Sequence, residues 1–361
     1  MGSPGGCTVA VVGGGVIGLS CAWRAALAGF PVTVHDPAPG SGASRVAGGM
    51  LAPVTEATPG EDEALALGVA ALRRWPAFAT ELTTAGADPG LQTQGTFVVA
   101  LDPGDRGELD RLAEQLSRSA RQVELLSGRE VRRVEPSLGP QVRRALSVPG
   151  DLSVDNRALV DALLTACRGA GVRFDRQHCS TLPAADVVVL AAGSHSGALH
   201  PALHGVIRPV KGEILRLRAR PGALAPPSRT VRAIVGGRRP YLVPRPGGQV
   251  VLGATQRDVG FDTDVTAGGV LELLADAERV LPALAEYTLE ETAAGLRPGS
   301  PDNLPLIGEL EPGVLVATGH HRNGLLLAPL TADAVLALLR GEPLPDEVAA
   351  ASPARLTHVE P

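Results

Sequence analysis

The segment from Thr8 to Asp36 constrains the fold more than any other part of the chain, because it contains a complete strand, helix and second strand. Thr8 to Val12 are apolar and predict a buried strand. Val16 to about Ala28 predict a helix that ends at a glycine. Val32 to His35 predict the next strand, so the segment is a β-α-β unit and indicates a parallel sheet in an α/β fold.

Three glycines between the first strand and the helix follow the spacing G-x-G-x-x-G. Gly13 permits the tight turn, Gly15 leaves room for a pyrophosphate beside the backbone, and Gly18 allows helix and strand to pack closely. Phosphates bind well at the positive end of a helix dipole, so this turn predicts a bound dinucleotide. Asp36 ends the second strand, where a carboxylate accepts hydrogen bonds from ribose hydroxyls and disfavours a 2′-phosphate.

The composition excludes several other classes of protein. With 361 residues, 44% hydrophobic residues and a net charge of −5, the chain has the balance of an ordinary globular protein of about two domains. It lacks the basic excess of nucleic-acid-binding proteins, so no nucleic-acid partner is expected. The four cysteines form no C-x-x-C pair, which predicts reduced thiols, no metal site and a cytoplasmic location. Neither a signal peptide nor a membrane span is expected.

Later segments complete the predicted architecture. Ala185 to Gly193, ADVVVLAAG, predicts a strand that is buried on both faces and returns to the nucleotide-binding sheet. Short apolar runs at Ile214–Leu217, Tyr241–Val243 and Val250–Gly253 predict a separate antiparallel sheet. We expect an α/β fold of the two-domain α+β type. A Rossmann-like domain (residues 1–84, 150–204 and 293–361) is interleaved with an antiparallel-sheet substrate domain (85–149 and 205–292).

Five further motifs follow the glycine turn: Gly48-Gly49-Met50-Leu51, Pro209-Val210-Lys211-Gly212-Glu213, Tyr241-Leu242-Val243-Pro244-Arg245, Gly295-Leu296-Arg297-Pro298-Gly299 and Gly319-His320-His321-Arg322-Asn323-Gly324. In this order they make the chain resemble flavin-dependent amino-acid oxidases of the D-amino-acid oxidase type, above all the glycine oxidases of thiamin biosynthesis, over residues 8 to 345. The resemblance implies non-covalent FAD, a small amino-acid substrate, O2 as oxidant, and an imine and hydrogen peroxide as products. It also implies a link to thiazole synthesis and a homo-oligomer.

The substrate carboxylate needs an anchor, and Arg297 is the leading candidate because a guanidinium binds a carboxylate through two hydrogen bonds. Tyr241 can add a hydroxyl donor, and Arg322 is the second candidate cation. Met50 is a further expected substrate contact. Hydride transfer from the substrate Cα to flavin N5 depends mainly on positioning, so no acid or base is expected to be obligatory.

The cofactor contacts are expected in five regions. Backbone amides and the helix dipole after the last motif can stabilise negative charge on the reduced flavin at N1 and C2=O. The expected contacts are Gly13, Gly15, Val16, Ile17, Gly18, Asp36, Pro37, Ala43, Ser44, Gly48, Gly49, Met50, Gly193, His320, His321, Arg322, Asn323, Gly324, Leu325 and Leu326.

Several alternatives stay open. The chain could be another FAD amine-oxidising enzyme, such as a sarcosine oxidase or a D-amino-acid dehydrogenase, or a flavin-binding protein without turnover. The segment Phe174–Pro183 is short where relatives carry a hairpin that contacts adenine, so that contact is not assigned. His321 stands where an aromatic residue is usual. Lys211, the one lysine among 33 basic residues, could assist the oxygen reaction, hold an inter-domain contact, or survive by chance.

Overall fold

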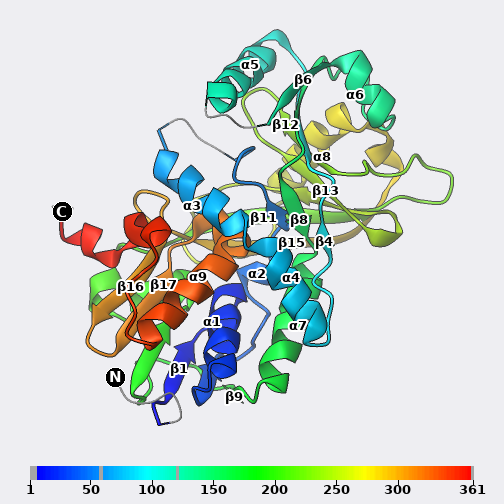
Figure 1. The fold of residues 1–361 in the computed structure, drawn as a ribbon. Helices are drawn as coiled ribbons and strands as arrows, with labels where there is room; N and C mark the ends of the chain where they lie inside the picture. Colours follow the sequence, from blue (N-terminus) through cyan, green and yellow to red (C-terminus); the bar gives the residue numbers. More distant parts are fainter. Residues whose placement is uncertain (1–5, 57–59, 119–121, 359–361) are drawn as a thin grey trace.

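The computed structural model describes residues 6–56, 60–118 and 122–358, and these residues form three sheets of six, eight and three strands. Figure 1 shows the six-stranded sheet with α1 and α9 in the lower half of the molecule. The eight-stranded sheet lies in the upper half, together with α5, α6 and α8. The molecule is therefore organised as the sequence predicts, with a nucleotide-binding half and a second half built on its own sheet.

The six-stranded sheet has the order β16-β17-β10-β1-β2-β9. Its strands are β1 (Val9–Val12), β2 (Val32–His35), β9 (Arg173–Asp175), β10 (Val187–Leu190), β16 (Leu306–Glu311) and β17 (Val314–Thr318). All neighbours are parallel except β16, which pairs antiparallel with β17. β10 pairs with β1 from Val9 opposite Val187, which confirms that the run ADVVVLAAG returns to the first sheet.

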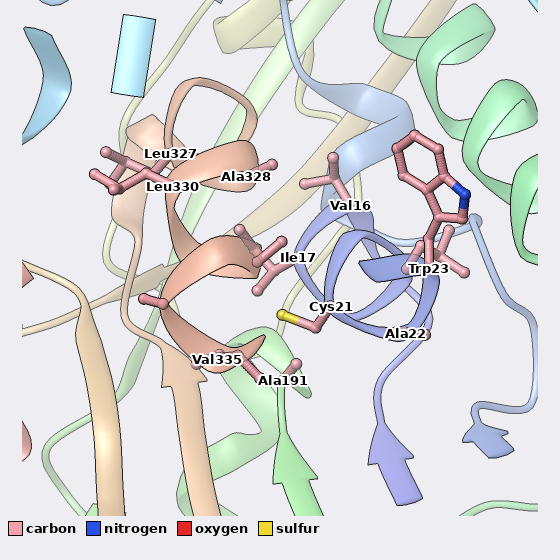
Figure 2. Packing of buried hydrophobic residues seen from close by; sticks show 14 of the residues in the cluster. Val16, Ile17, Cys21, Ala22, Trp23, Ala191, Leu327, Ala328, Leu330 and Val335 are labelled. Atoms are coloured by element: carbon pink, nitrogen blue, oxygen red, sulfur yellow. The ribbon is translucent and has the colours of Figure 1, made fainter. Parts of the chain in front are cut away.

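Two helices pack together on one face of this sheet. They are α1 (Val16–Leu27), which follows the glycine turn, and α9 (Gly324–Leu339). Figure 2 shows Ile17 and Cys21 of α1 on the side that faces α9, with Trp23 on the opposite side. The stretch His321–Leu339 is apolar and long enough to cross a membrane, but 67% of it is buried inside the protein. Burial in the core accounts for its apolar character.

The eight-stranded sheet has the order β15-β11-β14-β13-β12-β5-β7-β6. Its strands are β5 (Thr96–Ala100), β6 (Glu124–Ser127), β7 (Arg144–Val148), β11 (Arg208–Arg218), β12 (Thr230–Ile234), β13 (Tyr241–Arg245), β14 (Gln249–Gly253) and β15 (Thr288–Gly299). The three predicted runs lie in β11, β13 and β14, which pair antiparallel as predicted. β12, which was not predicted, runs parallel to β5. The sheet is covered by α5 (Pro103–Arg118), α6 (Gly128–Val134) and α8 (Ala267–Val280).

The predicted domain boundary between residues 292 and 293 falls inside β15, which pairs with β11 along its whole length. The three-stranded sheet, β3 (Met50–Leu51), β8 (Leu152–Val154) and β4 (Leu91–Gln92), follows the order β3-β8-β4. Helices α3 (Asp62–Leu72), α4 (Trp75–Thr84) and α7 (Asn156–Gly169) belong to the same core as α1. The domain boundaries stay a prediction.

The segment Ser41–Leu51 contains α2 (Ala43–Val46) and β3. Buried polar side chains hold it to the rest of the molecule. The Asn156 amide donates to the carbonyls of Ser44 (2.9 Å) and Arg45 (2.8 Å), and its oxygen accepts a hydrogen bond from Arg216 (3.2 Å). Satisfied hydrogen bonds are what make such burial tolerable. Residues of β11 and α7 thereby fix this segment.

Candidate active site

A cavity of about 920 Å³ lies between the two large sheets. On one side it is bounded by the carboxyl ends of parallel strands, with Val12 of β1, His35 of β2, Ala191 after β10 and Thr318 of β17. Ligands of open α/β sheets bind at this edge, where the strand order reverses direction. On the other side the wall comes from the eight-stranded sheet, so the cavity joins a nucleotide-binding edge to a second surface of different chemistry.

The glycine turn lines one end of the cavity. Gly13 has a φ of 109°, and a Cβ there would lie 2.3 Å from the Ala191 carbonyl oxygen. A Cβ at Gly18 would lie 1.9 Å from the Gly13 carbonyl oxygen, so this glycine allows α1 to pack on the turn. Gly15 differs, because a Cβ there would meet only Ser44 Oγ, at 3.3 Å. Space is therefore open in front of Gly15, as a pyrophosphate requires.

Asp36 lines the same end of the cavity, where its carboxylate accepts hydrogen bonds from the backbone N–H groups of Gly14 (2.6 Å) and Ala38 (2.8 Å). These bonds fix its orientation, and each oxygen can still accept another donor. The short segment Phe174–Pro183, whose contact was left unassigned, reaches the cavity through His178 and Cys179.

The motif from Gly319 to Gly324 forms η5 (His321–Asn323) and leads into α9. No side chain caps the start of α9, and Gly324 and Leu325 line the cavity there. The N-terminal amides of a helix attract negative charge. Burial lowers the pKa of His320 to about 3, and burial followed by Arg297 lowers that of His321 to about 4. Both histidines are therefore neutral at neutral pH.

Tyr241 and Arg297 project into the cavity from the eight-stranded sheet, and three glycines make room for them. A Cβ at Gly48 or at Gly253 would lie within 2.5 Å of the Tyr241 ring, and one at Gly212 within 2.5 Å of the Arg297 guanidinium. Arg297 donates one hydrogen bond to the Thr255 carbonyl (3.3 Å). Burial raises the pKa of Tyr241, and Arg297 opposes this effect. The phenol stays protonated and can donate to a carboxylate.

Arg322 also lines the cavity, but its guanidinium lies 3.4 Å from Glu61 Oε2 and from the Glu56 carbonyl oxygen. Gly18, Asn323 and Leu326, predicted as cofactor contacts, do not line the cavity. Gly18 instead allows α1 to pack on the turn. Leu326 is buried behind the cavity wall, where its carbonyl accepts a hydrogen bond from the Trp75 indole (2.9 Å). The other predicted site residues all line the cavity, and Met50 packs against the hydrophobic cluster that contains Tyr241.

Lys211 does not line the cavity. Its side chain is buried, with the ammonium 2.6 Å from Asp262 Oδ2 and also bonded to the Asp264 carbonyl. Glu213 Oε1 lies 3.7 Å from the same nitrogen. The contacts favour the hypothesis that Lys211 holds the segment around Asp262 against β11, and they give no support to a role in the oxygen reaction.

Three charged residues in or beside the cavity wall were not predicted from the sequence. They are Glu56 and Arg232 in the wall, and Asp151 beside them. Arg232 stands opposite Tyr241 in the β12–β13 pairing, so the two side chains share a face. The alternation of TVRAI could have indicated this face, but β12 was not predicted. Asp151 is fully buried beside Thr55, and among the described residues no hydrogen bond of good geometry reaches either of its oxygens.

Comparison with known proteins decides the family. Residues 8–338 match the family described as FAD dependent oxidoreductase. The chain belongs to this family. It is an oxidoreductase whose cofactor is FAD, and the open space before Gly15, the Asp36 carboxylate and the uncapped start of α9 fit that cofactor. Among the described residues, no group of three His, Cys, Asp or Glu side chains is arranged to hold a metal ion.

This FAD oxidoreductase is 35% identical to a putative thiamine biosynthesis oxidoreductase ThiO of Rhizobium etli over 91% of its own length and 94% of the relative. It is 34% identical to the glycine oxidase of Geobacillus kaustophilus, with 90% of each chain covered. The crystal structure of glycine oxidase from Geobacillus kaustophilus superposes with a TM-score of 0.89 at 31% identity, covering 98% and 99% of the two chains. The chain spans about half, 52%, of a bifunctional ThiO/ThiG protein of Nostoc sp..

A pair of glycine substitutions separates cofactor binding from folding. Gly15→Val adds atoms where the cavity is open, so we expect a folded protein that is purified largely without FAD. Gly18→Ala pushes a methyl group against the Gly13 carbonyl, so we expect a loss of about 1–3 kcal/mol in stability. FAD content and thermal unfolding of both variants check this. A Gly15→Val protein with a full complement of FAD would contradict the assignment of the glycine turn.

The buried Asp151 carboxyl predicts a pH-dependent stability. Burial raises the pKa of Asp151 from 3.8 to about 7, against the opposing effects of Thr55 and Arg232. The folded state thus holds a proton that the unfolded state releases, and stability falls as pH rises from about 4 to about 7. Asp151→Asn removes this loss, so the variant should gain up to about 4 kcal/mol relative to wild type at pH 8 and little at pH 4.

Unfolding curves of the two proteins between pH 4 and pH 8 measure this difference. Asp258→Asn is the control, because that side chain is 67% exposed. A constant difference between Asp151→Asn and wild type over this range would contradict the assignment.

Proposed function

We propose that the protein oxidises glycine, and that sarcosine or small D-amino acids are further substrates. Relatives named glycine oxidase that the chain matches over nine-tenths of its length support this substrate class. The observation that carries the proposal is the glycine-lined seating of Arg297 and Tyr241 in the wall of the cavity. A cation and a hydroxyl donor that face the same space suit a small carboxylate.

In the proposed reaction, Arg297 binds the substrate carboxylate and Tyr241 donates a hydrogen bond to one of its oxygens. These contacts fix the direction of the Cα–H bond, which is how positioning lowers the barrier. When bound, FAD supplies the hydride acceptor, and O2 regenerates its oxidised form with release of H2O2. His320 and His321 are neutral and add no positive charge to the cavity, and water hydrolyses the released imine to glyoxylate and ammonia.

We further propose that the product serves thiamine biosynthesis, which the name of the Rhizobium etli relative supports. An imine of glycine is the reactive form that a thiazole-forming step would consume. Two alternatives can be distinguished from a glycine oxidase by experiment. A sarcosine oxidase would prefer another amine, and a dehydrogenase that passes electrons to a quinone would release no hydrogen peroxide. A panel of small amines, scored by hydrogen peroxide released in air, distinguishes them from a glycine oxidase.

Substitution of Arg297 tests the carboxylate contact. Removing one partner of a charge-assisted pair in a closed site costs about 3–5 kcal/mol, so Arg297→Ala should lower kcat/KM by about 10² to 10³-fold or more while FAD stays bound. Tyr241→Phe keeps the ring and loses one hydrogen bond, so a loss of about tenfold is expected. Steady-state kinetics with glycine measure both.

Glycolate is a useful probe because it has the carboxylate without an amine to oxidise. It should inhibit the wild-type protein and fail to bind Arg297→Ala. Arg322→Ala is the matched comparison, since Arg322 lines the same cavity but is paired with Glu61. Normal glycolate binding by Arg297→Ala, or a greater loss in Arg322→Ala, would assign the carboxylate contact to another residue.

A further inference from the structure

Two charged side chains in the cavity wall, Glu56 and Arg232, have no part in the proposed carboxylate contact. Glu56 Oε1 lies 3.2 Å from the Arg232 guanidinium, and the two side chains are only 11% and 8% exposed. Arg232 also donates to the Thr55 carbonyl (2.8 Å), which fixes its position. A charged pair so far from bulk water is held by these contacts, and it places a carboxylate beside the substrate space.

Other acids in the cavity wall are engaged elsewhere. Asp36 lies at the glycine turn, where two backbone N–H groups hold it. Asp276 binds Arg238 through two hydrogen bonds of 2.6 and 2.5 Å, and Glu272 binds Arg257 at 3.1 Å. Among the described residues, the one ion-pair partner of Glu56 is Arg232, whose guanidinium lies 3.2 Å from Oε1. The second oxygen of Glu56 can accept a hydrogen bond from a ligand.

Glu56 also lies at the end of the cavity that contains Tyr241 and Arg297. After burial, the groups that act most on the pKa of Tyr241 are Arg297, which lowers it, then Glu56, which raises it, and then Arg232. The geometry agrees, because Arg232 pairs opposite Tyr241 across β12 and β13, Glu56 lies 3.2 Å from Arg232, and Arg297 lines the same cavity. An α-amino acid carries the complementary pair, a carboxylate and an amino group on one carbon.

We propose that Glu56, positioned by Arg232, accepts a hydrogen bond from the amino group of the substrate. This contact makes the site select α-amino acids over α-hydroxy acids of the same size. The inference rests on the proposed function, because it takes Arg297 as the carboxylate anchor. Arg232 acts through Glu56 and is a positioning residue.

The test compares two ligands that differ only in the amine. Glu56→Gln should raise the dissociation constant of glycine about tenfold, measured from anaerobic flavin reduction, because a charge-assisted hydrogen bond is lost. The inhibition constant of glycolate should change much less, because its neutral hydroxyl is a weaker donor to Glu56 than a charged amino group and the removal of a negative charge favours its carboxylate. The control is Glu63→Gln on the exposed surface of α3, which should change neither constant.

If Glu56 had only a structural role, its replacement would weaken the binding of both ligands equally. Equal weakening of glycine and glycolate binding therefore overturns the proposal. So does an unchanged glycine constant in Glu56→Gln. If the lone buried Arg232 prevents FAD binding in that variant, the double change Glu56→Gln and Arg232→Gln removes both charges, and the same selective loss of glycine is expected. Failure of glycine to reduce the wild-type flavin contradicts the proposed function instead, and the two failures are therefore distinct.

Discussion

The attachment of the segment Ser41–Leu51 to both halves of the molecule is the constraint on which the active-site cavity depends. Asn156 binds its carbonyls from α7, and Arg245 of β13 donates to the Gly48 carbonyl at 2.8 Å. Burial lowers the pKa of Arg245 to about 10, which shows how far these contacts lie from water. Because the polar groups of the segment are satisfied on both sides, it can form a wall of the cavity and set the spacing between the two sheets.

Close packing of glycines against Tyr241 and Arg297 positions these two side chains in the cavity. Gly48, in that same segment, and Gly253 of β14 both lie so close to Tyr241 that a Cβ at either position would collide with its phenol. Gly212 does the same for Arg297. Glycines that are scattered in the sequence thus share one purpose, which is to let two long side chains approach the backbone closely. A site built in this way holds its donors in place before any ligand arrives.

The sequence predicts the parts of the fold whose signals are local. The glycine turn, the helix α1 and the buried strands β1 and β10 lie where their patterns indicate. The helix α6 and the strand β7 were missed because Glu130–Pro149 is polar and interrupted by prolines. The parallel pairing of β12 with β5 joins residues more than a hundred positions apart, and no local pattern encodes such a partner.

The residues of the site divide in the same way, into those with a local sequence signal and those without one. Arg297 and Tyr241 were predicted through recognisable motifs, whereas Glu56 and Arg232 were missed because a charged residue normally lies on the surface. The pairing of β12 with β13 and β5 brings Arg232 to the cavity. Burial of these charges is tolerated because each is paired, and such pairs depend on tertiary structure that a single sequence does not display.

The central claim is that FAD and a small amino acid meet in this cavity, and anaerobic addition of glycine to the purified protein tests it most directly. The account predicts that glycine bleaches the absorbance of the oxidised flavin, and that air restores it with release of an equimolar amount of hydrogen peroxide. A protein that contains FAD and keeps its full flavin absorbance with glycine and with sarcosine would contradict the account.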